Sequence, residues 1–549
     1  MKFKNIINLG LVVTAFAVAT TGCKKQDFSN TDPDNNTENT VDFKSVLPAS
    51  MTATATVIEG ANFKFLQNWM GYWARSGSYQ DVTDEESYSF NNDFNVGVWN
   101  SLYTNATNYD FVVKKAHEAG AGSYEAIARI LKCMDFQMLV DIYGNVPYTE
   151  AFKGDADITP AYDKGIDVYD SLFVDLDRAI ALLKDPIATD PDKNKGLVGD
   201  VDNPAARPYG NDQVYNGNLT EWIKFANTLK LRMLIHAFQV PEFDVPGKMA
   251  AILAEGSGFL GAGESAILLP GYTSTKPNPF YRANVFTETG TAAANGAIER
   301  ANAYCIGPNP GAFMNLGYYQ YNGDARLDQF YVAPASGHRG IRYGEISGTN
   351  PGNTGDKLSS VGGPGYVPDG ANSRSWIFTD FESLFLQAEA VERGFMAGDA
   401  ETLLNSGITQ SFVFSGLTAA DADNYRTINA TYPDVDYQGV SQGTGLPAGG
   451  LFTILSQKWF AFNGFNTLES WTDWRRTDFP LGSGAGYMTD PGPPVSINPA
   501  RDNDAGIPIR LFYPQNEYNY NAANVIDQGD IDVTQAATPL TGRIFWDIN

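Results

Sequence analysis

Apolar residues recur at helical spacing in several separate stretches of the chain. One stretch runs from 222 to 236, and a second, with Ile127, Leu131, Met134 and Met138 on one face, ends at a turn signal after Tyr143. A third covers 452–462. Each pattern predicts an amphipathic helix with one buried face.

Two further patterns lie close together and predict a helical hairpin. Asp380 is placed to cap a helix with an apolar stripe from 381 to 391, and Asp399 to cap the next helix. Ala388 and Gly407 are small residues where the two helices would cross. This pairing is typical of tetratricopeptide-type αα-hairpins.

Long stretches at about 256–375 and 417–450 show no sustained period and are rich in Gly, Pro, Asn and Tyr. Loops of this length are either disordered or functional, and their aromatic content favours order. We therefore expect a mainly α fold, a single domain whose tetratricopeptide-like scaffold carries long ordered loop excursions.

Composition narrows the class of ligand. The 549 residues include 38 Lys and Arg against 63 Asp and Glu, which gives a net charge of −25. A surface this negative repels phosphate backbones, so we expect no nucleic-acid partner. The 28 Tyr, 33 Phe and 9 Trp are numerous enough to supply recognition surfaces as well as a core.

The N-terminus reads as an export signal that ends at a cysteine. Lys2 and Lys4 precede an apolar run over 6–19, and small residues lead to Cys23. This order predicts a lipoprotein signal at 1–22, lipidation of Cys23, a polar tether at 23–45 and a folded domain at 46–549. An ordinary secretory signal with an incidental cysteine is the alternative.

Five segments in order resemble one protein family. They are 27–33 (DFSNTDP), 140–148 (VDIYGNVPY), 381–390 (FESLFLQAEA), 457–459 with 469–480 (QKW, ESWTDWRRTDFP), and 507–514 with Glu517 (IPIRLFYP). The chain is similar here to the SusD/RagB-like outer-membrane nutrient-binding lipoproteins, in particular their starch-binding-associated branch.

The resemblance implies a non-catalytic, lipid-anchored protein at the outer membrane, exposed on the cell surface. Such a protein captures oligosaccharides and passes them to a SusC-like TonB-dependent barrel transporter. Related members include peptide importers, so a peptide ligand on the same scaffold is the first alternative. The family segments lie in the scaffold shared by all members, so we expect Arg475 and Arg476 to be buried and paired with carboxylates or helix carbonyls.

A sugar site needs an exposed aromatic ring beside a forked hydrogen-bonding group, because pyranose C–H faces stack on rings and vicinal hydroxyls need paired partners. Three loop regions offer this combination. They are Trp69, Trp73, Arg75 and Tyr79 after a helix near Thr56; Tyr272, Asn278, Tyr281 and Arg282; and Arg342, Tyr343 and Tyr366. For each aromatic residue the alternative is a ring that pins a loop onto the scaffold.

The residues give little support to an enzyme. A three-histidine metal site would need His117, His236 and His338 together, and His236 ends an apolar stripe, as expected of a core histidine. A surface glycoside hydrolase stays open, because it needs only two carboxylates. We expect no cofactor; a structural calcium near Asp434 and Asp436 matches no known loop spacing.

Two cysteines remain after Cys23. Cys133 lies inside a helical pattern and reads as a buried apolar residue. A disulfide between Cys133 and Cys305 is open, since the spacing does not place the two together.

Overall fold

The computed structural model describes residues 41–75, 83–154, 157–285, 299–307, 318–346, 348–439, 449–479, 495–501, 506–526 and 542–548. The chain divides into two units, Met1–Asp42 and Phe43–Asn549, and the described elements belong to the second. The second unit begins in a helix at Phe43, so the predicted boundary at 46 falls inside a helix. Cys23 lies outside the described residues.

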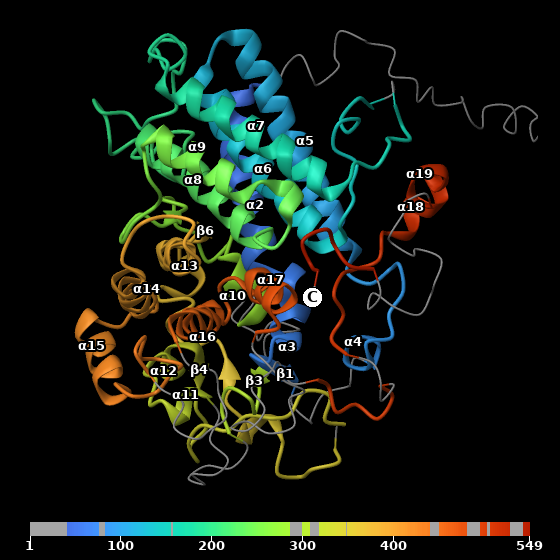
Figure 1. The fold of residues 1–549 in the computed structure, drawn as a ribbon, viewed down its shortest axis with the longest axis vertical. Helices are drawn as coiled ribbons and strands as arrows, with labels where there is room; N and C mark the ends of the chain where they lie inside the picture. Colours follow the sequence, from blue (N-terminus) through green and yellow to red (C-terminus); the bar gives the residue numbers. More distant parts are fainter. Residues whose placement is uncertain are drawn as a thin grey trace, which may run out of the picture. The chain divides into compact units, whose positions relative to one another are not determined.

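The first part of this unit is a stack of antiparallel helices (Figure 1). They are α2 (Phe43–Glu59), α5 (Val96–Ala119), α6 (Gly122–Tyr143), α7 (Gly165–Lys184), α8 (Leu219–His236) and α9 (Val245–Glu255). Each packs on its neighbour: α2 on α5, α5 on α6, α6 on α7 and α7 on α8. All residues of α6 are buried, so this helix is the centre of the stack.

The second part holds the predicted hairpin. It consists of α13 (Asp380–Glu392), α14 (Ala400–Phe414), α15 (Ala419–Ile428), α16 (Gly450–Phe462) and α17 (Thr467–Thr477). Helices α13 and α14 pack closely, and a Cβ atom added at Gly407 would lie 2.7 Å from the Phe385 ring. The prediction of an αα-hairpin with a small residue at the crossing is confirmed.

Two details of the second part differ from the sequence prediction. Thr379, not Asp380, is the N-cap of α13; the Asp380 carboxylate accepts a hydrogen bond from the Gly263 backbone N–H at 2.7 Å. Helix α15 lies in a stretch where no period was apparent, and a capping box between Thr418 and Asp421 starts it. The predicted cap at Asp399 is confirmed by its bond from the Thr402 N–H.

The remaining elements are short and lie in the excursions. They are η3 (Ala61–Phe63), α3 (Lys64–Trp69), β1 (Trp73–Arg75), α4 (Thr83–Ser87), η5 (Pro241–Phe243), β2 (Ala266–Ile267), α10 (Pro279–Asn284), β3 (Glu299–Ala301), α11 (Tyr318–Tyr321), α12 (Arg326–Phe330), β4 (Tyr331–Val332), η7 (Gly355–Lys357), β5 (Ser360–Val361), η8 (Gly370–Asn372), β6 (Trp376–Phe378), α18 (Gln515–Tyr520) and α19 (Ala522–Ile526). The sequence predicted a helix near Thr56 that leads into a loop. In the structure Thr56 lies in the last turn of α2, which ends at Glu59, and η3 and α3 follow it.

These short strands form two antiparallel sheets. The larger has the order β1-β3-β5-β4, with Trp73 opposite Ala301 and Arg75 opposite Glu299. The smaller pairs β2 with β6. The prediction of a mainly helical fold with long excursions is confirmed, whereas the two small sheets were not predicted.

Buried ion pairs join the parts of the scaffold. Arg476 donates to both carboxylate oxygens of Glu389 at 2.6 and 2.7 Å, which ties α17 to α13. Arg475 lies over the Trp471 ring at 3.6 Å and donates to the carbonyls of Asp141 and Ile509. The structural role predicted for both arginines is confirmed.

Cys133 and Cys305 are both buried and unbridged. Their thiols face the carbonyls of Leu172 and Gly71 respectively, in different parts of the core. Among the helices that the structure describes, none combines the length and the apolar character needed to cross a membrane.

Candidate functional site

A pocket of about 400 Å³ opens between strand β6 and the end of helix α14. We call it the β6–α14 pocket. Its lining comes from strands β2 and β6, from the segment between β5 and β6, and from α14: Ile267, Gly365, Tyr366, Pro368, Asp369, Arg374, Ser375, Trp376 and Phe414. The pocket thus lies where the mid-chain excursion meets the helical hairpin.

Two buried rings make a rigid apolar floor for this pocket. Trp376 donates its indole N–H to the Phe465 carbonyl at 3.3 Å, and the Tyr366 hydroxyl donates to the Asn463 carbonyl at 3.1 Å. The Tyr366 ring also stacks on Phe330, with centroids 5.1 Å apart. Because their polar atoms are engaged inside the protein, these rings present only carbon to the pocket.

The rim carries two opposite charges. Asp369 and Arg374 are exposed, and within the described residues neither side chain makes a hydrogen bond or an ion pair. The Phe414 ring beside them is half-buried. A cation, an anion and a ring at one opening can bind hydroxyl groups and a C–H face together.

The second predicted group lies against this pocket. The Ser375 hydroxyl is 3.1 Å from the Tyr272 hydroxyl, and Asn278 donates its backbone N–H to the Ala371 carbonyl. Burial raises the pKa of Tyr272 to about 12. Tyr272 and Tyr281 are half-buried and Arg282 is exposed, so all three can reach a ligand from the described surface.

Asn278 has a structural role instead. It is fully buried, its carboxamide oxygen caps α10 by accepting from the Tyr281 N–H at 3.0 Å, and its Nδ2 donates to Glu59 and Ser375. Every hydrogen-bonding atom of the side chain is therefore engaged. Its expected contact with a ligand is wrong for this conformation, because the amide cannot turn outward without uncapping the helix.

Glu85, a half-buried acid, lies between the first and third predicted groups, because it interacts with the Arg75 charge and contacts Tyr343. Its carboxylate accepts from Asn68 at 2.8 Å and from the Tyr343 hydroxyl at 3.3 Å. Burial raises the pKa of Glu85. Close by, the Glu299 carboxylate lies 3.2 Å from the Lys64 ammonium and 3.8 Å from Arg75, which stands opposite it in the sheet.

Several aromatics of these groups are core residues. Trp73 and Tyr343 are each 1% exposed, and Trp69 and Tyr366 are equally buried. A sugar cannot stack on a covered ring, so the alternative of rings that pin the excursions to the scaffold is correct for these four. Arg342 is exposed and unpartnered in the described region, whereas Tyr79 lies outside the described residues.

One group of potential metal ligands occurs among the described residues: Asp141, His236 and Glu469. The His236 Nε2 is 2.8 Å from Glu469, and its Nδ1 is 3.3 Å from Asp141. Burial alone would lower the pKa of His236, but these carboxylates raise it to about 9. His236 is 1% exposed and paired with both carboxylates, so it forms part of an internal ion-pair network, and the prediction of a core histidine is confirmed.

The other candidate ion site also has protein partners. Asp434 is buried and accepts from the Asn322 carboxamide at 2.7 Å, and burial raises its pKa. Asp436 accepts from the Gln438 backbone N–H at 3.2 Å. His117 and His338 pair with Glu125 and with Asp328, so the histidines have three separate environments.

Comparison with known proteins is consistent with this architecture. The model of a family described as starch-binding and associating with the outer membrane, SusD-like, matches residues 34–514. No curated protein sequence matches the chain.

Solved structures share the fold at low identity. A SusD homologue from Bacteroides uniformis is 22% identical, with a TM-score of 0.66 over 92% of this chain and 99% of the other. A chitin-binding SusD homologue from Flavobacterium johnsoniae is 21% identical, with a TM-score of 0.64 over 92% and 99%. A SusD homologue from Bacteroides fragilis is 19% identical, with a TM-score of 0.66 over the same shares. The chain therefore belongs to the SusD-like family of starch-binding proteins associated with the outer membrane, which are binding proteins and not enzymes.

Proposed function

We propose that this protein is a surface lipoprotein, anchored at Cys23, that captures oligosaccharides in the β6–α14 pocket and passes them to a SusC-like TonB-dependent transporter. The observation that carries the proposal is the pocket itself. It combines a rigid aromatic floor with Asp369 and Arg374 at the rim, whose side chains have no partner among the described residues. Family membership supports the ligand class and the outer membrane as the place of action.

The pocket's chemistry suits a sugar. Arg374 can donate two parallel N–H groups to neighbouring hydroxyls, and Asp369 accepts hydroxyl hydrogens with two oxygens. The half-buried ring of Phe414 offers a face for sugar C–H groups. Charges of opposite sign leave the opening close to neutral, so a neutral saccharide binds without an uncompensated charge.

Delivery requires weak binding and a closed complex. Tight capture would slow release into the transporter, whereas closure over the barrel would exclude water and add contacts from the partner. The polar composition of residues 24–39 suits a tether between the proposed lipid anchor and the folded unit, which begins at Phe43.

Calorimetric titration of the mature chain tests the capture site. The panel contains starch oligosaccharides, chitin oligosaccharides and a peptide digest, since one solved relative is described as chitin-binding. We expect one glycan class to bind, and Arg374→Ala to weaken that binding at least tenfold, because a hydrogen bond to a charged group contributes about 1.5–3 kcal/mol. Asp369→Ala should act in the same direction.

Lys193→Ala is the matched control, because it removes an exposed cation that does not line the pocket. Equal loss in both variants would mean that long-range charge, not the pocket, governs binding. Heat from peptides alone would make the protein a peptide importer. Cleaved sugar in the recovered samples would contradict a binding-only role.

A further inference from the structure

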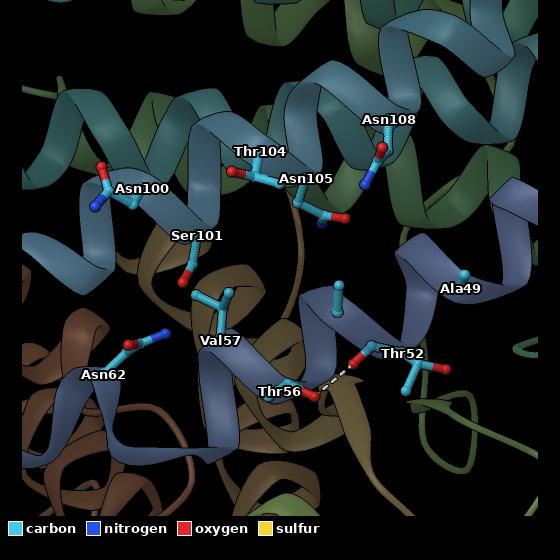
Figure 2. A pocket seen from close by; sticks show the side chains of 11 residues that line it. Ala49, Thr52, Thr56, Val57, Asn62, Asn100, Ser101, Thr104, Asn105 and Asn108 are labelled. Carbon is cyan, nitrogen blue, oxygen red and sulfur yellow. Dashed lines mark hydrogen bonds between the residues drawn. The ribbon is translucent and has the colours of Figure 1, made fainter. Parts of the chain in front are cut away.

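A separate recess of about 500 Å³ lies between helices α2 and α5 (Figure 2). We call it the α2–α5 groove. It shares no lining residue with the β6–α14 pocket. Its volume is within the usual range for small-molecule sites.

The lining of this groove is polar but carries no charge. One wall is α5, with Asn100, Ser101, Thr104, Asn105 and Asn108. The opposite wall is α2, which contributes two threonines between small apolar residues, and Asn62 closes one end. Of the residues that the structure describes, no ionisable and no aromatic one lines the groove, although the whole chain carries a net charge of −25.

One buried group in the groove is left without a partner. Asn105 is 2% exposed, and its Nδ2 donates to the Thr54 hydroxyl at 2.9 Å and to Asp135 at 3.0 Å. Its Oδ1 has no hydrogen-bond partner in the part of the chain that the structure describes. Figure 2 shows the carboxamide pointing from α5 toward the space above α2. A buried carbonyl without a donor costs about 1–3 kcal/mol, and a water or a ligand donor that reaches this atom from the groove would remove that cost.

The rim of the groove has spare hydrogen-bonding capacity as well. Within the described residues, the side chains of Asn100, Thr104 and Asn108 make no hydrogen bond. They stand four residues apart, so they follow one face of α5 along the groove. Each amide both donates and accepts, which suits a ligand that does the same.

We propose that the α2–α5 groove is a second saccharide site, which takes a short neutral sugar through its hydroxyl or acetamido groups and not by ring stacking. The small apolar side chains of Ala49, Ala53 and Val57 leave room for a ring edge or an acetamido methyl group. The proposal shares its ligand class with the capture function but rests on different residues.

A peptide fits this groove less well. A bound helix needs large apolar pockets for its anchor residues, and an added strand needs a sheet edge with free backbone groups. The groove has helices for walls, whose backbone groups are paired, and its apolar side chains are small. An ionic ligand would find no counter-charge.

The test uses the mature chain with the capture pocket disabled by Arg374→Ala and Asp369→Ala. Saturation-transfer NMR titrations with maltotriose and with N,N′-diacetylchitobiose measure the remaining binding. We expect at least one probe to bind, and the further changes Asn100→Ala, Thr104→Ala and Asn108→Ala to weaken it at least tenfold. Ala53→Phe, which fills the groove, should have the same effect.

Thr107→Ala is the control on the same helix, because Thr107 is exposed, outside the groove, and bonded to the Tyr103 carbonyl. Circular dichroism checks that all variants fold. If the wild type binds a probe but the disabled background does not, the second site is overturned while the capture function stands. If neither the wild type nor any variant binds a probe, both the capture function and the second saccharide site are overturned. Binding of a neutral capped peptide in the groove, in place of sugar, would also overturn the proposal of a second saccharide site.

Discussion

His236 shows how a single buried residue links the two halves of the scaffold. Its imidazole joins Asp141 on α6 to Glu469 on α17, and the Tyr169 hydroxyl on α7 lies 3.2 Å from its Nδ1. Because these carboxylates hold the pKa at about 9, the ring stays protonated where a free histidine, near 6.5, is neutral.

Because of this difference in pKa, the folded protein should become less stable as the pH becomes alkaline. The folded pKa lies above the unfolded value, so the stabilisation is complete below about pH 6.5 and is lost as the pH rises through 9. We expect this residue to account for a loss of roughly 3 kcal/mol in the free energy of unfolding over that range. Urea unfolding at pH 6, 7.5 and 9.5, with His236→Gln for comparison, measures it. Parallel pH profiles for the two proteins would contradict the argument.

Residue type alone does not distinguish an aromatic ring that faces solvent from one that is buried in the core. Trp73 and Tyr281 occur in similar loop sequences, yet Trp73 is enclosed by Phe280 and Asn463 whereas Tyr281, one residue from Phe280, faces outward enough to be half-buried. That difference depends on long-range packing. The ligand contacts predicted for Tyr272, Tyr281 and Arg282 stay predictions; of the three, Tyr272 lies against a lining residue of the β6–α14 pocket, Ser375. The proposed contacts of Asp369 and Arg374 are absent from the sequence prediction, because their only local signal is a charged pair in a glycine-rich loop.

At the scale of elements, the contact between α13 and α14 depends on the absence of a side chain at Gly407. We expect Gly407→Ala to lower the free energy of unfolding by about 1–2 kcal/mol, because the new methyl group would lie 2.7 Å from the Phe385 ring. Overpacking costs about 1–3 kcal/mol and outweighs the gain of about 1 kcal/mol in helix propensity. Thermal unfolding of the variant measures the change.

Gly97→Ala in α5 is a matched comparison. There the added Cβ would have only the Asn62 Oδ1 atom within reach, at 3.6 Å, an ordinary contact. Propensity then dominates, and this variant should be more stable by up to about 1 kcal/mol. If both variants shift the melting temperature in the same direction, the close packing at Gly407 does not control the hairpin.

Helices with a clear apolar stripe and a strong start signal were predictable from sequence. The stripes of α6, α8, α13 and α16 were recognised, and Asp399 was correctly placed as a cap. Helix α15 was missed, because only Ala422 and Tyr425 of its ten residues are buried and its capping box was the sole local signal. The short strands could not be predicted, since two or three residues per strand carry no measurable period.

At the scale of the whole molecule, the helical scaffold carries two recessed sites of different chemistry. The β6–α14 pocket pairs rings with opposite charges, whereas the α2–α5 groove offers amides and hydroxyls. A net charge of −25 disfavours anionic ligands at either place, which is consistent with neutral sugars at both. The two sites come from separate parts of the sequence, so each can be changed without the other.

Attachment to the membrane should be separable from both sites. The compact unit begins at Phe43, and every residue of the pocket and the groove lies within it, so the lipidation that we propose for Cys23 would take place outside the unit that holds both. We expect Cys23→Ala to move the protein from the membrane fraction to the soluble fraction, while its affinity for the glycan stays within twofold of the wild type. Fractionation with immunoblotting and titration of the purified protein measure the two effects. Retention in the membrane fraction would mean that Cys23 is not the anchor, and loss of binding would mean that the N-terminal segment contributes to the site.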